Sequence, residues 1–277
     1  MTDLFKVILI ETHNHCNRTC WFCKFGQERQ DAEHARMSME TIELIIQNLK
    51  ELGYDGRVSW FFINEPLLDK RIFDIVERTR ASLPKAFISL VTNGDLLTAE
   101  IYGKLRQKGL DALGVSIYDQ DVFRKMQGFS NDGRLALMDR RAAPNGNQAG
   151  NVKQPAQSFD EDVLRFSGST CMRPFRMMVV NAQGKVALCC SDLYTDVEMG
   201  DVHADRLEHI WRNEKFQRYR ETLSANGRRG LALCESCSHS GRASPVFYPL
   251  SVMPRRRSNL DAVKSAFSIQ RRNPDEK

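Results

Sequence analysis

Apolar and polar positions along the first half of the chain follow a pattern that predicts alternating strands and helices. Apolar runs of strand length lie at 5–12, 58–64, 87–94 and 113–118, and segments of helical periodicity lie at 38–53, 69–83 and 98–109. Ser38 and Thr98 are residues that cap helix N-termini, while Gly53, Pro84 and Gly109 end the helices. Regular alternation with short connections predicts parallel strands joined by right-handed crossovers, and therefore a barrel or an open α/β sheet.

This rhythm ends near residue 128, and a different composition follows. Residues 128–169 are rich in Gly, Asn, Pro and Gln, with one further strand candidate at 134–138. Farther on, 175–190 predicts a hairpin that turns around Asn181 to Gly184, followed by a helical stretch. The expected divisions are a core at 1–127, a barrel end and loop-rich linker at 128–169, a small second unit at 170–245, and a flexible basic tail at 246–277.

The chain of 277 residues has the composition of an ordinary globular protein. Its net charge of +5 does not change this interpretation. Residues 254–277 hold seven basic and three acidic residues, so +4 of the +5 lies in the tail and the body is nearly neutral. We therefore expect no nucleic-acid partner. Apolar runs are too short to span a bilayer, and the N-terminus lacks the basic region of a signal peptide. These features predict a cytoplasmic protein without a membrane partner.

Eight cysteines in a reducing compartment indicate metal or redox chemistry rather than disulfides. Cys16, Cys20 and Cys23 place three thiols in eight residues, one fewer than a closed tetrahedral zinc site or a closed iron–sulfur cube needs. Either His13 or His15 supplies a fourth ligand, or one metal position is open. A second set follows, and its spacing fits a zinc ribbon and an iron–sulfur cluster equally well: Cys171, Cys189, Cys190, Cys234 and Cys237.

The polar residues of the first half follow the predicted strands, each at its carboxyl end. The cysteine loop follows the first strand, 64–69 follows the second, 92–95 follows the third, and Ser116 lies near the end of the fourth. Parallel strands bring their carboxyl ends to one rim, which is where α/β folds place functional residues. The sequence therefore predicts that these segments meet.

Cys16-x-x-x-Cys20-x-Phe22-Cys23 resembles the signature of the radical S-adenosylmethionine (SAM) superfamily. The resemblance implies a partial (β/α) barrel in which the three cysteines hold a [4Fe–4S] cluster and SAM chelates the fourth iron. The segment around Asn64 and Glu65 stands where the family carries a Gly-Gly-Glu-Pro type sequence. The SAM contacts that the resemblance implies are Phe22, Asn64, Glu65, Thr92, Asn93, Ser116 and Arg124.

The second cysteine set resembles the SPASM/twitch extension of radical SAM enzymes, which carries an auxiliary [4Fe–4S] cluster. The resemblance implies that its ligands are Cys171, Cys189, Cys234 and Cys237. If 185–190 is a strand, Cys189 and Cys190 point to opposite faces, which leaves Cys190 as a spare thiol.

The implied chemistry begins with an electron from a flavodoxin or ferredoxin and cleavage of SAM to a 5′-deoxyadenosyl radical, which takes a hydrogen atom from a small-molecule substrate. The arrangement most resembles dehydrogenases that oxidise a secondary alcohol of an aminosugar or cyclitol to a ketone in aminoglycoside-type biosynthesis. Substrate-side candidates are Asp192, Cys190, Gln148 and Arg140 or Arg141. The alternatives are an epimerase in which Cys190 returns the hydrogen atom, a peptide-modifying enzyme of the same superfamily, and a non-enzymatic zinc or electron-transfer protein. The N-terminus leaves no room for the leader-binding domain of a peptide modifier.

Overall fold

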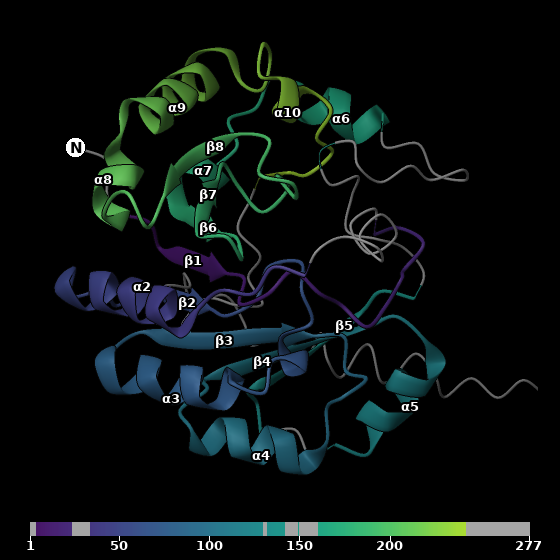
Figure 1. The fold of residues 1–277 in the computed structure, drawn as a ribbon. Coiled ribbons are helices and arrows are strands. Elements are labelled where there is room, and N and C mark those ends of the chain that lie inside the picture. Colours follow the sequence, from purple (N-terminus) through teal and green to yellow (C-terminus); the bar gives the residue numbers. More distant parts are fainter. Residues whose placement is uncertain (1–3, 24–33, 130–131, 142–148, 150–159, 242–277) are drawn as a thin grey trace, which may run out of the picture. The chain divides into compact units, whose positions relative to one another are not determined.

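The computed structural model describes residues 4–23, 34–129, 132–141, 149 and 160–241. Its described strands form one sheet of eight in the order β5-β4-β3-β2-β1-β6-β7-β8 (Figure 1). The strands are β1 Val7–Ile10, β2 Arg57–Ser59, β3 Phe87–Thr92, β4 Ala112–Ile117, β5 Leu135–Asp139, β6 Met177–Val180, β7 Lys185–Ala187 and β8 Glu198–Asp201. Both predicted cysteine sets thus belong to chain segments that flank a single sheet.

Strands β1 to β5 are parallel and lie side by side in chain order. Val7 pairs with Arg57, and Ser59 pairs with Ser89. Because each right-handed crossover moves to the next strand in the same direction, the helices collect on one face, as in a barrel. Figure 1 shows α3 and α4 on the same side of β3 and β4. The predicted partial (β/α) barrel is confirmed.

Ser38, Thr98 and Gly53 mark helix boundaries as predicted. Ser38 accepts a hydrogen bond from Thr41 N at 3.1 Å, and Thr98 accepts one from Ile101 N at 3.1 Å. Gly53 adopts a φ of 58°, the left-handed conformation that ends a helix. The helices are α2 Met39–Glu51, the 3₁₀ turn η1 Pro66–Leu68, α3 Ile72–Ser82, α4 Ala99–Gln107, α5 Gln120–Gln127, α6 Asp160–Ser167, α7 Arg173–Arg176, α8 Leu207–Arg212, α9 Glu214–Asn226 and α10 Ala232–Glu235.

Two predicted elements are shorter than expected. The strand predicted at 58–64 ends at Ser59, since the following chain turns and Asn64 Oδ1 accepts a hydrogen bond from Phe62 N at 3.0 Å. The helix predicted at 69–83 begins at Ile72, after the separate turn η1. The carboxylate of Glu65 caps this turn by accepting from Leu67 N at 3.1 Å. Polar side chains that bond the local backbone therefore replaced regular structure at this rim.

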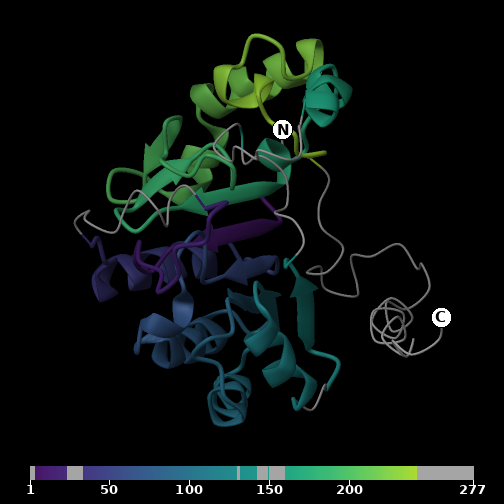
Figure 2. The same cartoon turned by 90° about the vertical axis from the view of Figure 1, so that its right-hand side faces the viewer.

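The predicted hairpin is present, and it extends the sheet of the core. Asn181 Oδ1 accepts hydrogen bonds from Gln183 N and Lys185 N, at 3.0 and 2.9 Å, which closes the turn. Gly184 has a φ of 81°, where a side chain would be strained. Strand β6 pairs in parallel with β1, and β7 pairs antiparallel with β6. Figure 2 shows β6 beside β1, with α9 and α10 at the far end from α3 and α4.

The expectation that 185–190 is a strand is wrong. Strand β7 ends at Ala187, because Leu188 N donates to the Asp192 carboxylate at 3.3 Å and the chain turns there. The opposite directions of Cys189 and Cys190 thus cannot follow from strand alternation.

No helix among the described residues is long and apolar enough to cross a bilayer.

Candidate active site

The cysteine loop after β1 meets the ends of the neighbouring strands, as the parallel order predicts. Asn93, directly after β3, donates from Nδ2 to Asn17 Oδ1 at 2.8 Å and to Cys16 Sγ at 3.8 Å. Cys23 N donates to the Cys20 carbonyl at 2.9 Å, which folds the loop into a turn. Three thiols and two asparagines therefore share one edge of the sheet.

The three thiols are close enough to affect each other's ionisation. Burial raises the pKa of Cys16, and the neighbouring Cys23 raises it further. Burial and the same neighbour raise the pKa of Cys20 to about 11. Such thiols stay protonated at neutral pH unless a bound cation stabilises their thiolates, so the donor set fits a metal cluster.

Arg18 fastens the cysteine loop to two other strands. Its Nε donates to Asp95 Oδ2 at 2.7 Å, after β3, and its Nη2 donates to Asp119 Oδ2 at 2.5 Å, after β4. Asn17 Nδ2 donates to the same Asp95 oxygen at 2.9 Å. Sequence reasoning missed Arg18, although its position inside the cysteine signature was a usable signal.

Glu65 joins the ends of β2 and β3. Its carboxylate accepts from Thr92 Oγ1 at 2.7 Å and from Asn93 N at 2.7 Å, besides the bond from Leu67 N. Burial raises its pKa, and these hydrogen bonds oppose the rise. The neighbouring Asn64 is buried and its Nδ2 has no partner. A buried donor without a partner at this rim fits a bound polar ligand.

Tyr118 is a rim residue that sequence reasoning missed. It is hydrogen-bonded to Ser116 and half-buried, and burial raises its pKa. The Phe22 ring lies 5.3 Å from the Tyr118 ring, measured between centroids. Arg140, after β5, contributes to the same surroundings, where burial lowers its pKa and Tyr118 raises it. The ends of β4 and β5 and the cysteine loop thus meet at Tyr118.

Two candidates are not brought into this rim, and a third is not described. Arg124 is exposed on α5 and pairs with Asp121 at 2.8 Å. The buried carboxylate of Asp192 accepts bonds from the backbone of 188–197, including Asp196 N at 2.8 Å, so it organises a loop. Gln148 lies outside the described residues, although the adjacent Ala149 is described.

The two histidines considered as extra ligands have other contacts. His13 Nδ1 accepts a hydrogen bond from His15 N at 3.1 Å, and the His15 ring lies 4.4 Å from the His34 ring. Over the described ranges, no three His, Cys, Asp or Glu side chains converge on a point that suits a single ion. A cubane has a separate iron at each corner, so its thiolates stand farther apart than the ligands of one ion.

Four cysteines of the second set line one cavity, and these are Cys171, Cys189, Cys234 and Cys237. The cavity contains about 340 Å³ of atom-free space and is partly open to solvent. Cys190 is half-buried and is not among its lining residues. Gly241 packs against Cys171, and a side chain would not fit at this position, since a Cβ there would lie 2.7 Å from Cys171 Sγ.

Polar groups also line the four-cysteine cavity. Arg173 and Arg228 are both present, together with His239, whose pKa is lowered to about 3 by burial and by the two arginines. Ala149, which follows Gln148 in the chain, lines it as well and accepts a hydrogen bond from Ser236 at 3.0 Å. Ala149 therefore brings one described residue of the 128–169 region to the cavity.

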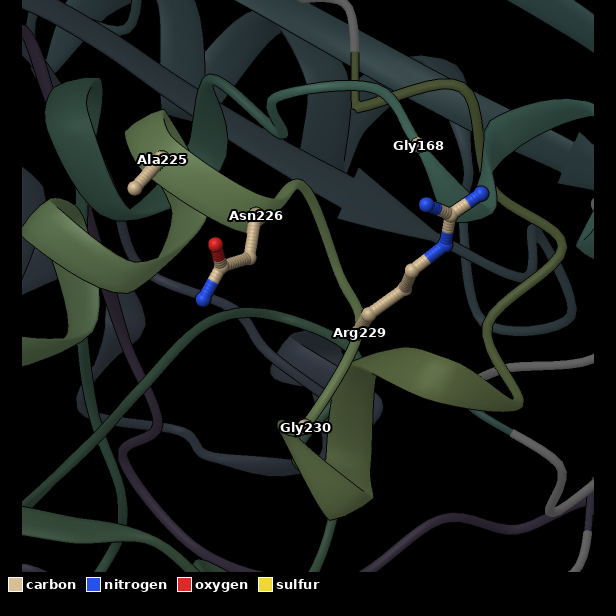
Figure 3. Close-up of a pocket in the computed structure, with 5 residues that line it drawn as sticks. All are labelled: Gly168, Ala225, Asn226, Arg229 and Gly230. Carbon is tan, nitrogen blue, oxygen red and sulfur yellow. The ribbon is translucent and has the colours of Figure 1, made fainter.

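A larger surface pocket, with about 750 Å³ of atom-free space, lies elsewhere, beside the C-terminal end of α9 (Figure 3). It is lined by Gly168, Ala225, Asn226, Arg229 and Gly230. This set contains no thiol, carboxylate or imidazole, so the pocket has none of the groups that the chemistry requires.

A parallel sheet with a three-cysteine loop at its carboxyl rim and a four-cysteine cavity beyond β6 defines a class of protein. The Radical SAM superfamily matches residues 10–130, and the SPASM iron–sulfur cluster-binding domain matches residues 171–238. The chain belongs to the radical SAM superfamily and carries a SPASM domain. Its cofactors are accordingly SAM and two iron–sulfur clusters.

Particular relatives cover nearly the same length. An S-adenosyl-L-methionine-dependent 2-deoxy-scyllo-inosamine dehydrogenase from Niallia circulans is 27% identical over 86% of this chain and 95% of its own. The crystal structure of BtrN in complex with AdoMet and 2-DOIA has a TM-score of 0.75 and 27% identity, and covers 86% of this chain and 94% of that one. BtrN in an open conformation, at 24% identity and a TM-score of 0.67, covers 88% and 100% and shares the fold.

Proposed function

We propose that this enzyme is a SAM-dependent dehydrogenase that oxidises a secondary alcohol of an aminocyclitol or aminosugar to a ketone. The observation that carries the proposal is the four-thiol cavity beside the three-thiol rim, in a chain similar over 86% of its length to a 2-deoxy-scyllo-inosamine dehydrogenase. A two-electron oxidation needs an electron acceptor besides SAM, and a second cluster provides one. We place the enzyme in aminoglycoside-type biosynthesis.

The two sets of cysteines supply the ligands of the two clusters. Cys16, Cys20 and Cys23, within the core at 1–127, hold the SAM-binding cluster. The auxiliary cluster belongs to the unit at 170–245, where its ligands are the four cavity-lining cysteines, Cys171, Cys189, Cys234 and Cys237. The cavity supports this choice over one that includes Cys190, because that thiol does not line it.

When bound, the first cluster and SAM supply the radical that removes a hydrogen atom from a substrate carbon, and the second cluster supplies an electron acceptor. The residues of the rim bind SAM and orient it. Asn64, whose Nδ2 has no partner, would donate a hydrogen bond to SAM, and Glu65 would accept one from the SAM amine in addition to those from Thr92 and Asn93. Phe22, Thr92, Asn93 and Ser116 complete the SAM contacts.

The substrate lies between the rim and the four-cysteine cavity. Arg140 stands at the rim beside Tyr118, and Ala149 lines the cavity. Arg140 and Tyr118 are therefore the polar groups we assign to the substrate hydroxyl. Electrons enter from a flavodoxin or ferredoxin, and the enzyme works in the cytoplasm.

Anaerobic turnover tests the proposal. Reduced enzyme with SAM and 2-deoxy-scyllo-inosamine, or another aminocyclitol from a panel, is expected to form ketone and 5′-deoxyadenosine in equal amounts. A Cys16→Ala variant should form neither. SAM cleavage without an oxidised product from any member of the panel would contradict dehydrogenation.

An epimerase is the second candidate, because the Cys190 thiol is half-buried and does not line the four-cysteine cavity. An epimerase returns a hydrogen atom to the substrate, and Cys190 would donate it. In deuterated water it would give a deuterated alcohol and no ketone, and Cys190→Ala would abolish this product. For a dehydrogenase, Cys190→Ala should retain ketone formation within about twofold, since surface changes away from a site alter free energies by only a few tenths of a kcal/mol.

A further inference from the structure

Two arginines line the four-cysteine cavity, and neither has an acidic partner among the described residues. Arg228 is 1% exposed, and its Nη1 donates to the Cys237 carbonyl at 2.8 Å. Arg173 donates from Nη1 to Ser191 Oγ at 2.7 Å. In the part of the chain that the structure describes, no carboxylate forms an ion pair with either guanidinium.

Arg228 also holds unused donors. Its Nε and Nη2 are buried and have no hydrogen-bond partner. A buried guanidinium without an anion is costly, and a buried donor without an acceptor adds about 1–3 kcal/mol. Proteins retain such groups where a ligand completes them. The cavity that Arg228 lines is therefore built for an anion that accepts hydrogen bonds.

A cluster with four thiolate ligands has that chemistry. Four thiolates outweigh the positive charge of the cubane core, and the excess negative charge grows when the cluster accepts an electron. The reduction potential of an iron–sulfur cluster depends on net charge, on hydrogen bonds to its sulfurs and on exposure to solvent. Buried cations and N–H donors favour the reduced state, because they stabilise its additional charge more strongly.

We propose that Arg228, assisted by Arg173, raises the reduction potential of the auxiliary cluster and so makes it an effective electron acceptor. This inference rests on the proposed ligand set at the second site. Arg228 lines the cavity and keeps two buried N–H donors without a partner, and Arg173 lines the same cavity with Cys189 and Cys171. Both act through the cluster and do not touch the substrate.

A redox titration tests this role. The full-length chain carrying Cys16→Ala, Cys20→Ala and Cys23→Ala retains only the auxiliary cluster, whose potential is read from its electron paramagnetic resonance signal. Arg228→Gln is expected to shift the reduction equilibrium at least tenfold toward the oxidised form, which is about 59 mV for a one-electron couple. Arg173→Gln should shift it in the same direction.

Arg229→Gln is the matched control. It removes the same charge one residue away, from an exposed side chain that lines the surface pocket of Figure 3 and not the four-cysteine cavity. Its potential should equal that of the parent. A fully loaded Arg228→Gln cluster with the potential of the Arg229→Gln cluster would overturn the inference.

Arg228→Lys covers the case in which Arg228→Gln loses iron. Iron retained in the lysine variant but lost in the glutamine variant would support charge compensation, since lysine keeps the charge. Iron lost in both would overturn it and assign Arg228 to packing. The result is independent of the ketone assay, so failure of the dehydrogenase proposal is seen separately. No iron in the parent of this series would reject the ligand set itself.

Discussion

Buried carboxylates at the rim satisfy several donors at once. A carboxylate offers about four lone-pair sites, and Glu65 uses three of them for Thr92, Asn93 and Leu67. One site is left for a further donor, such as an ammonium group. The same side chain can therefore fasten two strand ends together and contact SAM.

Asp69 is a second buried carboxylate, and it stabilises the segment between η1 and α3. It accepts hydrogen bonds from Arg71 Nη2 at 2.7 Å and from Arg36 Nη2 at 2.9 Å. Burial alone would raise its pKa, but the two guanidiniums prevail and lower the pKa to about 2. Because the folded pKa lies below the ordinary value, the stabilisation is complete above about pH 4 and is lost as the pH falls toward about 2.

We therefore expect Asp69→Asn to reduce the free energy of unfolding by about 2 kcal/mol at neutral pH, from roughly 1.4 kcal/mol per pKa unit. The difference between parent and variant should be constant from pH 6 to pH 8, since this range lies above the window of loss. Anaerobic urea denaturation measures it. Asp121→Asn, which breaks an exposed pair with Arg124, should change stability by a few tenths of a kcal/mol. A difference that varies across this pH range would contradict the assignment.

At the scale of elements, the cysteine loop depends on strands that it does not pair with. Arg18 connects the loop after β1 to the ends of β3 and β4 through Asp95 and Asp119. Hydrogen bonds between charged groups contribute about 1.5–3 kcal/mol each when partly buried. Loss of the Arg18 side chain should therefore make local opening of the loop more frequent.

Arg18→Gln is expected to accelerate loss of the SAM-binding cluster to an iron chelator at least tenfold, because weaker fastening lets the loop open more often. The cluster is followed by the part of the electron paramagnetic resonance signal that SAM perturbs. Arg78→Gln removes an arginine whose pair with Glu43 is exposed, and should leave the rate unchanged. Equal rates in the two variants would show that Arg18 does not fasten the loop.

At the scale of the whole molecule, one sheet connects the two cysteine sets. Strand β1, which precedes the first set, lies between β2 and β6, and β6 begins the hairpin that precedes Cys189. The geometry between the two sites is therefore set by paired strands rather than by a linker. The described chain should unfold as a single unit.

Val186→Ala tests whether the described chain unfolds as a single unit, since Val186 is fully buried on β7. Removing the two methyl groups should cost about 1–2 kcal/mol. If the sheet opens cooperatively, hydrogen exchange of the slowest amides in β2 and β3 should accelerate by the same factor as in β7. Leu164→Ala, at a position 74% exposed, should change neither. Acceleration confined to β6–β8 would indicate two independently unfolding parts.

Local chemistry explains which features were predictable. Ser38, Thr98 and Gly53 act within one helical turn, so their capping roles can be read from neighbouring residues. Helices α5 and α6 were missed because each has only 8 residues, too few for a clear helical pattern. The cysteine signature was recognisable since its three residues lie within one loop.

Side chains that act across elements were not predictable in this way. Arg18, Tyr118 and Arg228 reach the two sites through strand order and packing. Each meets a residue far away in the sequence, namely Asp119 for Arg18, Phe22 for Tyr118 and Cys171 for Arg228. The direction of Cys189 is a similar case, since it follows from a turn held by Asp192 rather than from strand alternation.

The sequence by itself determined the βα alternation, the helix ends and the two sets of thiols, because spacing and capping are local properties of the chain. Only the tertiary structure decided which thiols gather and which buried cations surround them. Those outcomes depend on the register of β6 against β1 and on how α10 packs, and such long-range contacts combine residues that no local pattern relates.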